Sequence, residues 1–173
     1  TESENIFVFD SQLAAGGLFL LISETKKLID HGHTFAQIVK ELPKIRDRIS
    51  VTFSVDDMTP LRNSGRIGFV RMSVGTILNI KPILQCKDGG VVFDSVARGN
   101  NEIIKKLAAK IPPDVEEAVI NYIANNRTAP NLYNIVKEKF PNIKIRFSKM
   151  GPVLGVHLGL QVVALSFITS GEK

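Results

Sequence analysis

The stretch IKPILQCKDGGVVFDSV, residues 80–96, decides the class of fold. It contains two runs rich in β-forming side chains, residues 80–86 and 91–96, separated by the tip Lys87-Asp88-Gly89-Gly90. A glycine-containing tip between two alternating apolar runs is the signature of a β-hairpin. Because a hairpin joins antiparallel strands, at least part of the sheet is predicted to be antiparallel.

Helical and strand patterns alternate on the N-terminal side of this hairpin. Apolar residues at helical spacing predict two helices, which we expect at residues 12–31, capped by Asp10-Ser11, and 35–48, capped by Thr34. Strict alternation predicts a strand over residues 50–55. Two short helices are expected next, one ending at Asn63-Ser64-Gly65 and one over residues 67–77.

The same alternation continues after the hairpin. Helices are predicted at residues 100–111, capped by Asn100 or Asn101, and at 131–140, and strands at 117–123, 143–147 and 160–168. Interleaved helices and strands that include a tight hairpin predict an α/β domain with a mixed sheet covered by helices.

Length and composition bound the class of protein. The chain has 173 residues, of which 44% are hydrophobic, and it carries 22 cationic and 17 acidic residues, a net charge of 22 − 17 = +5. We expect one domain, residues 1–173, whose hydrophobic core needs no disulfide or metal ion to be stable. The lone Cys86 excludes a disulfide framework, and the three histidines lack metal-ligand spacing, so no metal or cofactor is expected.

Targeting signals are not evident in the sequence. The acidic start, Thr1-Glu2-Ser3-Glu4, differs from the positive start of a signal peptide. The apolar stretches 13–22 and 153–168 are too short or too interrupted to span a bilayer. A cytoplasmic protein without stable membrane insertion is therefore predicted.

No arrangement of residues for catalysis is visible. In a hairpin strand, Cys86 is interpreted as a small buried hydrophobe. Asp56-Asp57 is interpreted as a helix cap in preference to a metal or acid–base pair. The cationic residues are scattered and tryptophan is absent, so nucleic-acid binding is kept only as an alternative.

Three glycine-containing segments, which we interpret as loops, carry the most specific signal, and they stand in a fixed order. They are LRNSGRI (61–67), ILNIKPIL (77–84) and GPVLGVHLG (151–159), with Arg98-Gly99 between the last two. Asp10-Ser11 ahead of a helix start rich in small residues adds a further feature. In this order, over residues 8–168, the sequence resembles the DegV family of bacterial fatty-acid-binding proteins.

The resemblance implies the second, C-terminal domain of such a protein, with a fold like that of dihydroxyacetone kinase subunits. The family's N-terminal domain, whose hydroxyl groups bind the carboxylate, is expected to be absent. The resemblance also implies a carrier and not an enzyme. Such a carrier holds a long-chain fatty acid and presents its carboxylate to a partner fatty acid kinase, which makes the acyl-phosphate for phospholipid synthesis.

The resemblance also implies site residues. His157 is expected to contact the carboxylate, with Gly155 and Gly159 allowing close approach of the backbone. Arg62 or Arg66 is expected at the pocket mouth or in kinase docking, with Lys81 and Arg98 as weaker candidates. Expected wall residues are Phe53, Val55, Ile77, Leu78, Leu154, Leu158, Val163 and Leu165. Burial of about 14 methylenes contributes on the order of 11 kcal/mol, so apolar wall area must supply most of the affinity.

Other interpretations of these residues remain open. Taken singly, each wall residue is as readily ordinary core, and His157 a structural histidine. A dihydroxyacetone-kinase-like enzyme subunit, with His157 holding the substrate covalently, is one alternative function. A basic regulatory or nucleic-acid-binding module is the other.

Overall fold

The computed structural model describes residues 6–65, 80–124 and 127–171. Within these residues six strands form one sheet in the order β3-β2-β1-β6-β4-β5. Their bounds are β1 (Ile49–Ser54), β2 (Ile80–Lys87), β3 (Gly90–Arg98), β4 (Val115–Tyr122), β5 (Lys144–Lys149) and β6 (Val163–Thr169). Only the β4–β5 pairing is parallel, and the other four are antiparallel. The predicted mixed sheet is therefore confirmed.

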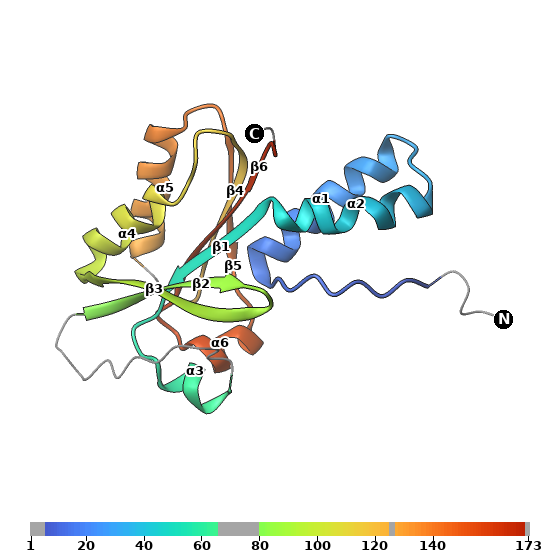
Figure 1. The fold of residues 1–173 in the computed structure, drawn as a ribbon. Coiled ribbons are helices and arrows are strands. Elements are labelled where there is room, and N and C mark those ends of the chain that lie inside the picture. Colours follow the sequence, from blue (N-terminus) through green and yellow to red (C-terminus); the bar gives the residue numbers. More distant parts are fainter. Residues whose placement is uncertain (1–5, 66–79, 125–126, 172–173) are drawn as a thin grey trace.

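Helices cover both faces of this sheet. They are α1 (Ala15–Asp30), α2 (Phe35–Asp47), α3 (Thr59–Asn63), α4 (Gly99–Ala109), α5 (Thr128–Lys139) and α6 (Pro152–Leu158). Helices α4 and α5 lie side by side on one face, whereas α1 starts on the other face and projects outward with α2 (Figure 1). The short helices α3 and α6 lie together at one end of the molecule (Figure 1).

The alternation of side chains along β6 shows how the sheet separates two apolar layers. Val163, Leu165 and Phe167 belong to the core beneath α4 and α5. Val162 and Ala164 belong to a second cluster on the α1 face. Successive side chains in a strand point to opposite faces, so a strand covered on both sides is apolar at almost every position.

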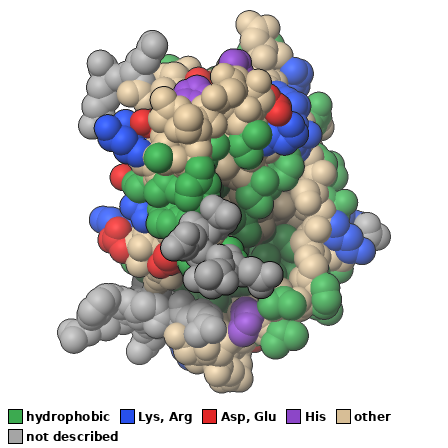
Figure 2. All heavy atoms as spheres, turned by 90° about the vertical axis from the view of Figure 1, so that its right-hand side faces the viewer, with side chains coloured by type: hydrophobic (Ala, Val, Ile, Leu, Met, Phe, Trp, Pro, Cys, Tyr) green, Lys and Arg blue, Asp and Glu red, His purple; other side chains and the backbone are tan. Residues whose placement is uncertain are grey.

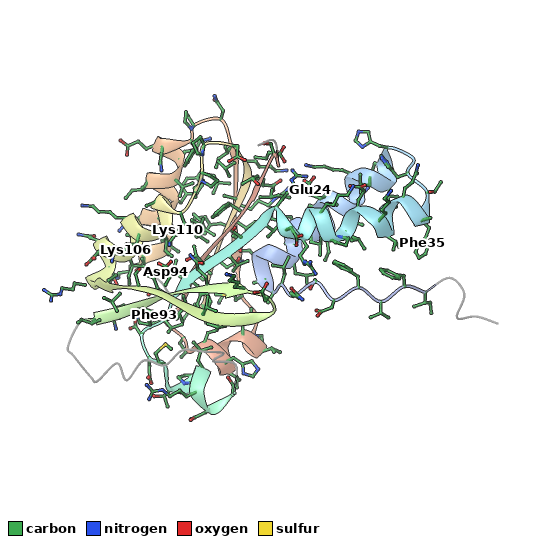
Figure 3. All side chains as sticks on the ribbon, in the orientation of Figure 1. Glu24, Phe35, Phe93, Asp94, Lys106 and Lys110 are labelled. Atoms are coloured by element: carbon green, nitrogen blue, oxygen red, sulfur yellow. The ribbon has the colours of Figure 1, made fainter. Side chains whose placement is uncertain are left out.

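The predicted hairpin is present and is fixed to α4. Phe93 of β3 packs against the cluster on the α1 face, while Asp94 points the other way and pairs with Lys110 of α4 (Figure 3). Lys106 of α4 donates a hydrogen bond to the carbonyl oxygen of Val96. Burial alone would raise the pKa of Asp94, but the hydrogen bonds from Lys110 and Ser95 outweigh it and the pKa is lowered.

The helix starts show where local signals decide and where they do not. Thr34 caps α2 as predicted, because its Oγ1 accepts from the Gln37 N–H at 3.4 Å and Gln37 Oε1 accepts from the Thr34 N–H at 2.8 Å. The expected cap Asp10-Ser11 is wrong: α1 begins at Ala15, and Asp10 Oδ1 accepts from the Gln12 N–H in a local turn at 3.1 Å.

Other element boundaries also differ from the prediction, and one predicted helix is not tested. Helix α4 begins at Gly99 rather than after Asn100 or Asn101, and Glu102 Oε2 accepts from the Arg98 N–H at 2.7 Å. The last strand begins at Val163, not at residue 160. The helix expected over residues 67–77 lies outside the described residues.

Candidate functional site

The start of α1 lies unusually close to the sheet. Gly16 has no side chain, and a Cβ built there would lie 2.3 Å from Asn121 Oδ1 and 2.9 Å from Val119 Cβ. The Gly16 N–H donates to Asn121 Oδ1 at 2.9 Å. This contact holds the segment before the helix, residues 10–14, over the sheet beside β1 and the hairpin.

A cavity of about 370 Å³ lies between this segment, β1, the hairpin tip and α6. Most of its wall is apolar and includes Val51, Phe53, Leu61, Met150, Leu154 and Leu158. On the face that carries α1, hydrophobic side chains gather around a hollow (Figure 2). The volume and apolar lining are those of a small-molecule site, since ligand pockets usually measure about 300–1,000 Å³.

His157 is one of the polar groups in this largely apolar wall, to which Asp10, Ser11 and Gln12 of the segment before α1 also contribute. It lies in α6, and its Nδ1 atom is buried with no hydrogen-bond partner among the residues that the structure describes. Buried polar side-chain atoms usually have a partner, so an unpaired one facing an apolar cavity has hydrogen-bonding capacity left for a ligand.

The segment that carries His157 is a helix, although its three glycines were interpreted as a loop. Pro152 occupies the first turn of α6, where a missing N–H costs nothing. Gly159 ends the helix with a left-handed backbone, φ +81°. The glycines therefore stand before, within and after one short helix.

Cys86 also lines the cavity, from β2. Burial raises the pKa of its thiol to about 11, so the thiol stays protonated near neutral pH. A protonated thiol is a poor nucleophile and packs as a small apolar group. This supports the interpretation of Cys86 as a structural residue.

Four of the predicted site residues are brought together in this cavity. Phe53, Leu154, Leu158 and His157 all line it. Gly155 and Gly159 do not: a Cβ at Gly155 would meet Ile123 Cδ1 at 3.7 Å, and one at Gly159 would meet Pro60 Cγ at 3.8 Å. In the structure, both glycines lie where α6 packs against neighbouring side chains.

Several other predicted wall and rim residues lie elsewhere. Val55 is buried in the neighbouring apolar cluster, and Val163 and Leu165 face α4 and α5 on the opposite side of the sheet. Arg62 is exposed in the last turn of α3 and does not line the cavity.

The remaining candidates are placed as follows. Lys81 pairs with Asp56 at 3.2 Å, and Arg98 precedes α4. Arg66, Ile77 and Leu78 fall outside the described residues.

Sequence reasoning missed part of the wall. Met150, Ala164 and Val51 line the cavity but were not predicted. For Val51, the signal was present, because it shares the strand face of Phe53 two residues away. Met150 carried no such signal, because its place depends on where β5 ends relative to α1.

The paired aspartates have structural partners. Asp57 Oδ1 accepts from the Thr59 N–H at 2.8 Å and from the Thr59 hydroxyl at 2.7 Å, and these bonds lower its pKa. Asp57 therefore binds the first residue of α3, but the N-cap position itself is Met58, which makes no side-chain capping bond, so the expected cap is displaced by one residue. Over residues 6–65, 80–124 and 127–171, no three His, Cys, Asp or Glu side chains are grouped as a metal site would require. In the same described part of the chain, no helix has the length and apolar character needed to cross a bilayer.

Comparison with known proteins identifies the relatives of this domain. The family model described as "Uncharacterised protein, DegV family" matches residues 1–170. A DegV domain-containing protein of Clostridium acetobutylicum is 33% identical over 168 residues, covering 92% of this chain and 59% of that protein. A DegV domain-containing protein of Staphylococcus aureus is 30% identical over 173 residues, covering 96% and 60%.

Solved structures show the same fold. A DegV family protein from Thermus thermophilus, described by its fatty acid binding, superposes with a TM-score of 0.84 at 26% identity, over 96% of this chain and 61% of that chain. The Streptococcus pneumoniae Fatty Acid Kinase B3 protein, loaded with linoleic acid, gives a TM-score of 0.86 at 20% identity, over 96% and 60%.

The family match covers nearly the whole chain, while the chain spans about 60% of the length of the relatives named above. The mixed sheet and its helical layers agree with that match, since the same fold is found in the solved structure of a DegV family protein. This chain belongs to the DegV family.

Proposed function

We propose that this domain binds a long-chain fatty acid, with the acyl chain in the apolar cavity and the carboxylate at His157. One observation carries the proposal. A cavity of about 370 Å³ with a mostly apolar wall contains one imidazole whose buried Nδ1 has no partner among the described residues. An aliphatic chain with one polar end matches that distribution of groups.

The expected energetics agree with this division of roles. Each methylene removed from water contributes about 0.8 kcal/mol, whereas a hydrogen bond to a charged group contributes about 1.5–3 kcal/mol. The wall therefore supplies most of the affinity, and His157 determines which end of the ligand lies beside α6. A protein of this kind carries its ligand and performs no bond chemistry.

Known relatives support the ligand class. The Thermus thermophilus relative is described by its fatty acid binding, and the Streptococcus pneumoniae protein of the same fold is loaded with linoleic acid. The name of the Streptococcus pneumoniae protein includes the words fatty acid kinase. We extend the proposal to presentation of the carboxylate to such a kinase for acyl-phosphate formation, with Arg62 and Arg66 in docking.

Paired substitutions in α6 test the binding site. Leu158 lines the cavity, whereas Val156, in the same helix, is 75% exposed. Calorimetric titration with palmitate should show saturable binding by the unmodified domain. Leu158→Asn should weaken it at least about tenfold, because a polar amide replaces apolar wall, and Val156→Asn should change it less than about twofold.

Circular dichroism of both variants checks that the fold is retained. Absence of saturable binding by the unmodified domain would contradict the proposal, as would equal losses in the two variants.

A further inference from the structure

A second cavity adjoins the first on the same face of the sheet. It measures about 390 Å³ and lies towards β4 and β5, where Phe19, Val119, Asn121 and Arg146 contribute to its lining. The two cavities share three lining residues, which are Ala15, Met150 and Leu154. These three residues therefore stand at the boundary between the cavities.

We propose that Met150, together with Ala15 and Leu154, forms a partition that sets the length of acyl chain the domain accepts. This inference rests on the proposed function. The first cavity takes the part of the chain nearest the carboxylate, and the second is closed to the tail unless Met150 moves.

The backbone near two of the three boundary residues, Ala15 and Met150, is held in place by hydrogen bonds. Ala15 begins α1 with a left-handed backbone, φ +47°, and the next residue, Gly16, is bonded to Asn121. The Met150 N–H donates to the carbonyl oxygen of Tyr122 at 2.8 Å. The backbone of the partition is thus tied to β4 from two directions.

The side chain of Met150 is the adjustable part of the partition. It is 8% exposed and packs in the apolar cluster that includes Phe53 and Ala164. A methionine side chain is unbranched and adopts several shapes at low cost, whereas Ala15 has no side-chain torsion to rotate. Leu154 is branched and has fewer side-chain torsions than Met150, so the width of the passage depends chiefly on Met150.

Two cationic side chains, Arg146 and Lys149, line the second cavity beside its apolar residues. Its guanidinium group, on Arg146, is already paired with Glu117 at 2.5 Å and lies 4.9 Å from the centre of the Phe19 ring. His157, with its unpartnered nitrogen, lines only the first of the two cavities. With the carboxylate at His157, as proposed above, the polar end of the ligand lies in the first cavity and the methyl end reaches the partition.

The partition makes a prediction about chain length. While the passage is open, each further methylene that is buried raises the affinity roughly fourfold. With the passage closed, methylenes beyond the first cavity stay in water and add nothing. The affinity of the unmodified domain should therefore level off along the series of saturated fatty acids from myristate to arachidate.

Two methionine substitutions separate the partition from general loss of packing. Met150→Ala opens the passage, whereas Met58→Ala removes the same atoms from the same apolar cluster at a residue that is 9% exposed and lines neither cavity. The ratio of stearate to myristate affinity should rise at least about tenfold in Met150→Ala. It should stay unchanged in Met58→Ala and in the volume-conserving Met150→Leu.

The outcomes distinguish this inference from the function on which it rests. If the unmodified domain binds fatty acids and the affinity ratio is the same in Met150→Ala and Met58→Ala, the partition is overturned and fatty-acid binding stands. If the unmodified domain binds none of the fatty acids, the proposed function fails and the partition fails with it.

Discussion

The backbone N–H of Gly16 donates a hydrogen bond to Asn121 Oδ1 across 2.9 Å, joining the first turn of α1 to β4. The contact requires a residue without a side chain, because a Cβ at this position would lie 2.3 Å from the same oxygen. Through this bond the segment before α1 becomes a wall of the cavity. The position of α1 and the shape of the candidate site thus depend on one close approach.

Replacement of Gly16 by alanine should destabilise the domain. The new methyl group would overlap Asn121, Val119 and Ser166, so either the helix or the strands must shift. Overpacking of this kind costs about 1–3 kcal/mol, and we expect that loss of unfolding free energy in urea denaturation. The affinity for palmitate should fall too, since the segment 10–14 moves with the helix.

Gly155→Ala is the matched control for this substitution. A Cβ at Gly155 would meet Ile123 Cδ1 at 3.7 Å, an ordinary contact, inside a helix. Alanine favours a helix over glycine by up to about 1 kcal/mol, so stability should be unchanged or slightly higher. Equal destabilisation by the two variants would contradict the close approach described for Gly16.

Replacement of His157 by glutamine should weaken fatty-acid binding without unfolding the domain. Loss of a hydrogen bond to a carboxylate reduces affinity by about tenfold or more. His33→Gln serves as control, because His33 is exposed beyond the end of α1, with its Nδ1 3.1 Å from the carbonyl oxygen of Leu28.

Calorimetric titration with palmitate measures both variants. A Lys149→Gln variant tests the opposite orientation of the ligand, because Lys149 is a cationic side chain that lines the second cavity. If Lys149→Gln weakened binding while His157→Gln did not, the proposed orientation of the ligand would be reversed.

The cavity wall should also make stability depend on alkaline pH through Cys86. Burial raises the pKa of this thiol from its ordinary 9.0 to about 11. Between these values the unfolded chain releases the proton and the folded domain keeps it, so the unfolding free energy falls as pH rises. The contribution is complete below pH 9 and is lost by about pH 11, up to about 3 kcal/mol.

Urea denaturation across this pH range, under reducing conditions, isolates the effect by comparison with Cys86→Ala. The unfolding free energy of the unmodified domain should fall more steeply than that of the variant. If the unfolding free energies of the two proteins fell in parallel as the pH rises, the pKa of Cys86 would not be raised by burial in the cavity wall.

Local patterns were sufficient for much of the fold. The hairpin over residues 80–96 was predicted because two alternating runs and a glycine tip stand next to each other in the sequence. The cap at Thr34 was predicted for the same reason, since its partner Gln37 is three residues away. Both features are decided by neighbours along the chain.

The errors arise where distant residues decide. The start of α1 depends on Asn121, which no pattern near residue 15 can reveal. Val163 and Leu165 were expected in the cavity wall, but a shift of one residue along a strand exchanges its faces. The apolar run after residue 160 did not indicate which residues face α4 and α5 and which face α1.

The helix α6 is a different kind of error, because its signal was present. Proline in the first turn and glycine after the last residue are the usual ends of a helix, yet the glycines were interpreted as loop. The cavity itself could not be predicted, because its walls come from segments separated by more than a hundred residues, from Leu13 to Leu158.

The central claim is that an acyl chain lies in the cavity on the α1 face of the sheet. Stearate carrying a nitroxide near its methyl end, titrated into methyl-labelled protein, tests this most directly by NMR line broadening. The account predicts selective broadening of the methyl signals of Met150 and Leu154, while those of Leu107 in α4 and Leu132 in α5, buried on the opposite face of the sheet, stay sharp. Broadening centred on Leu107 and Leu132, or no selective broadening at all, would contradict it.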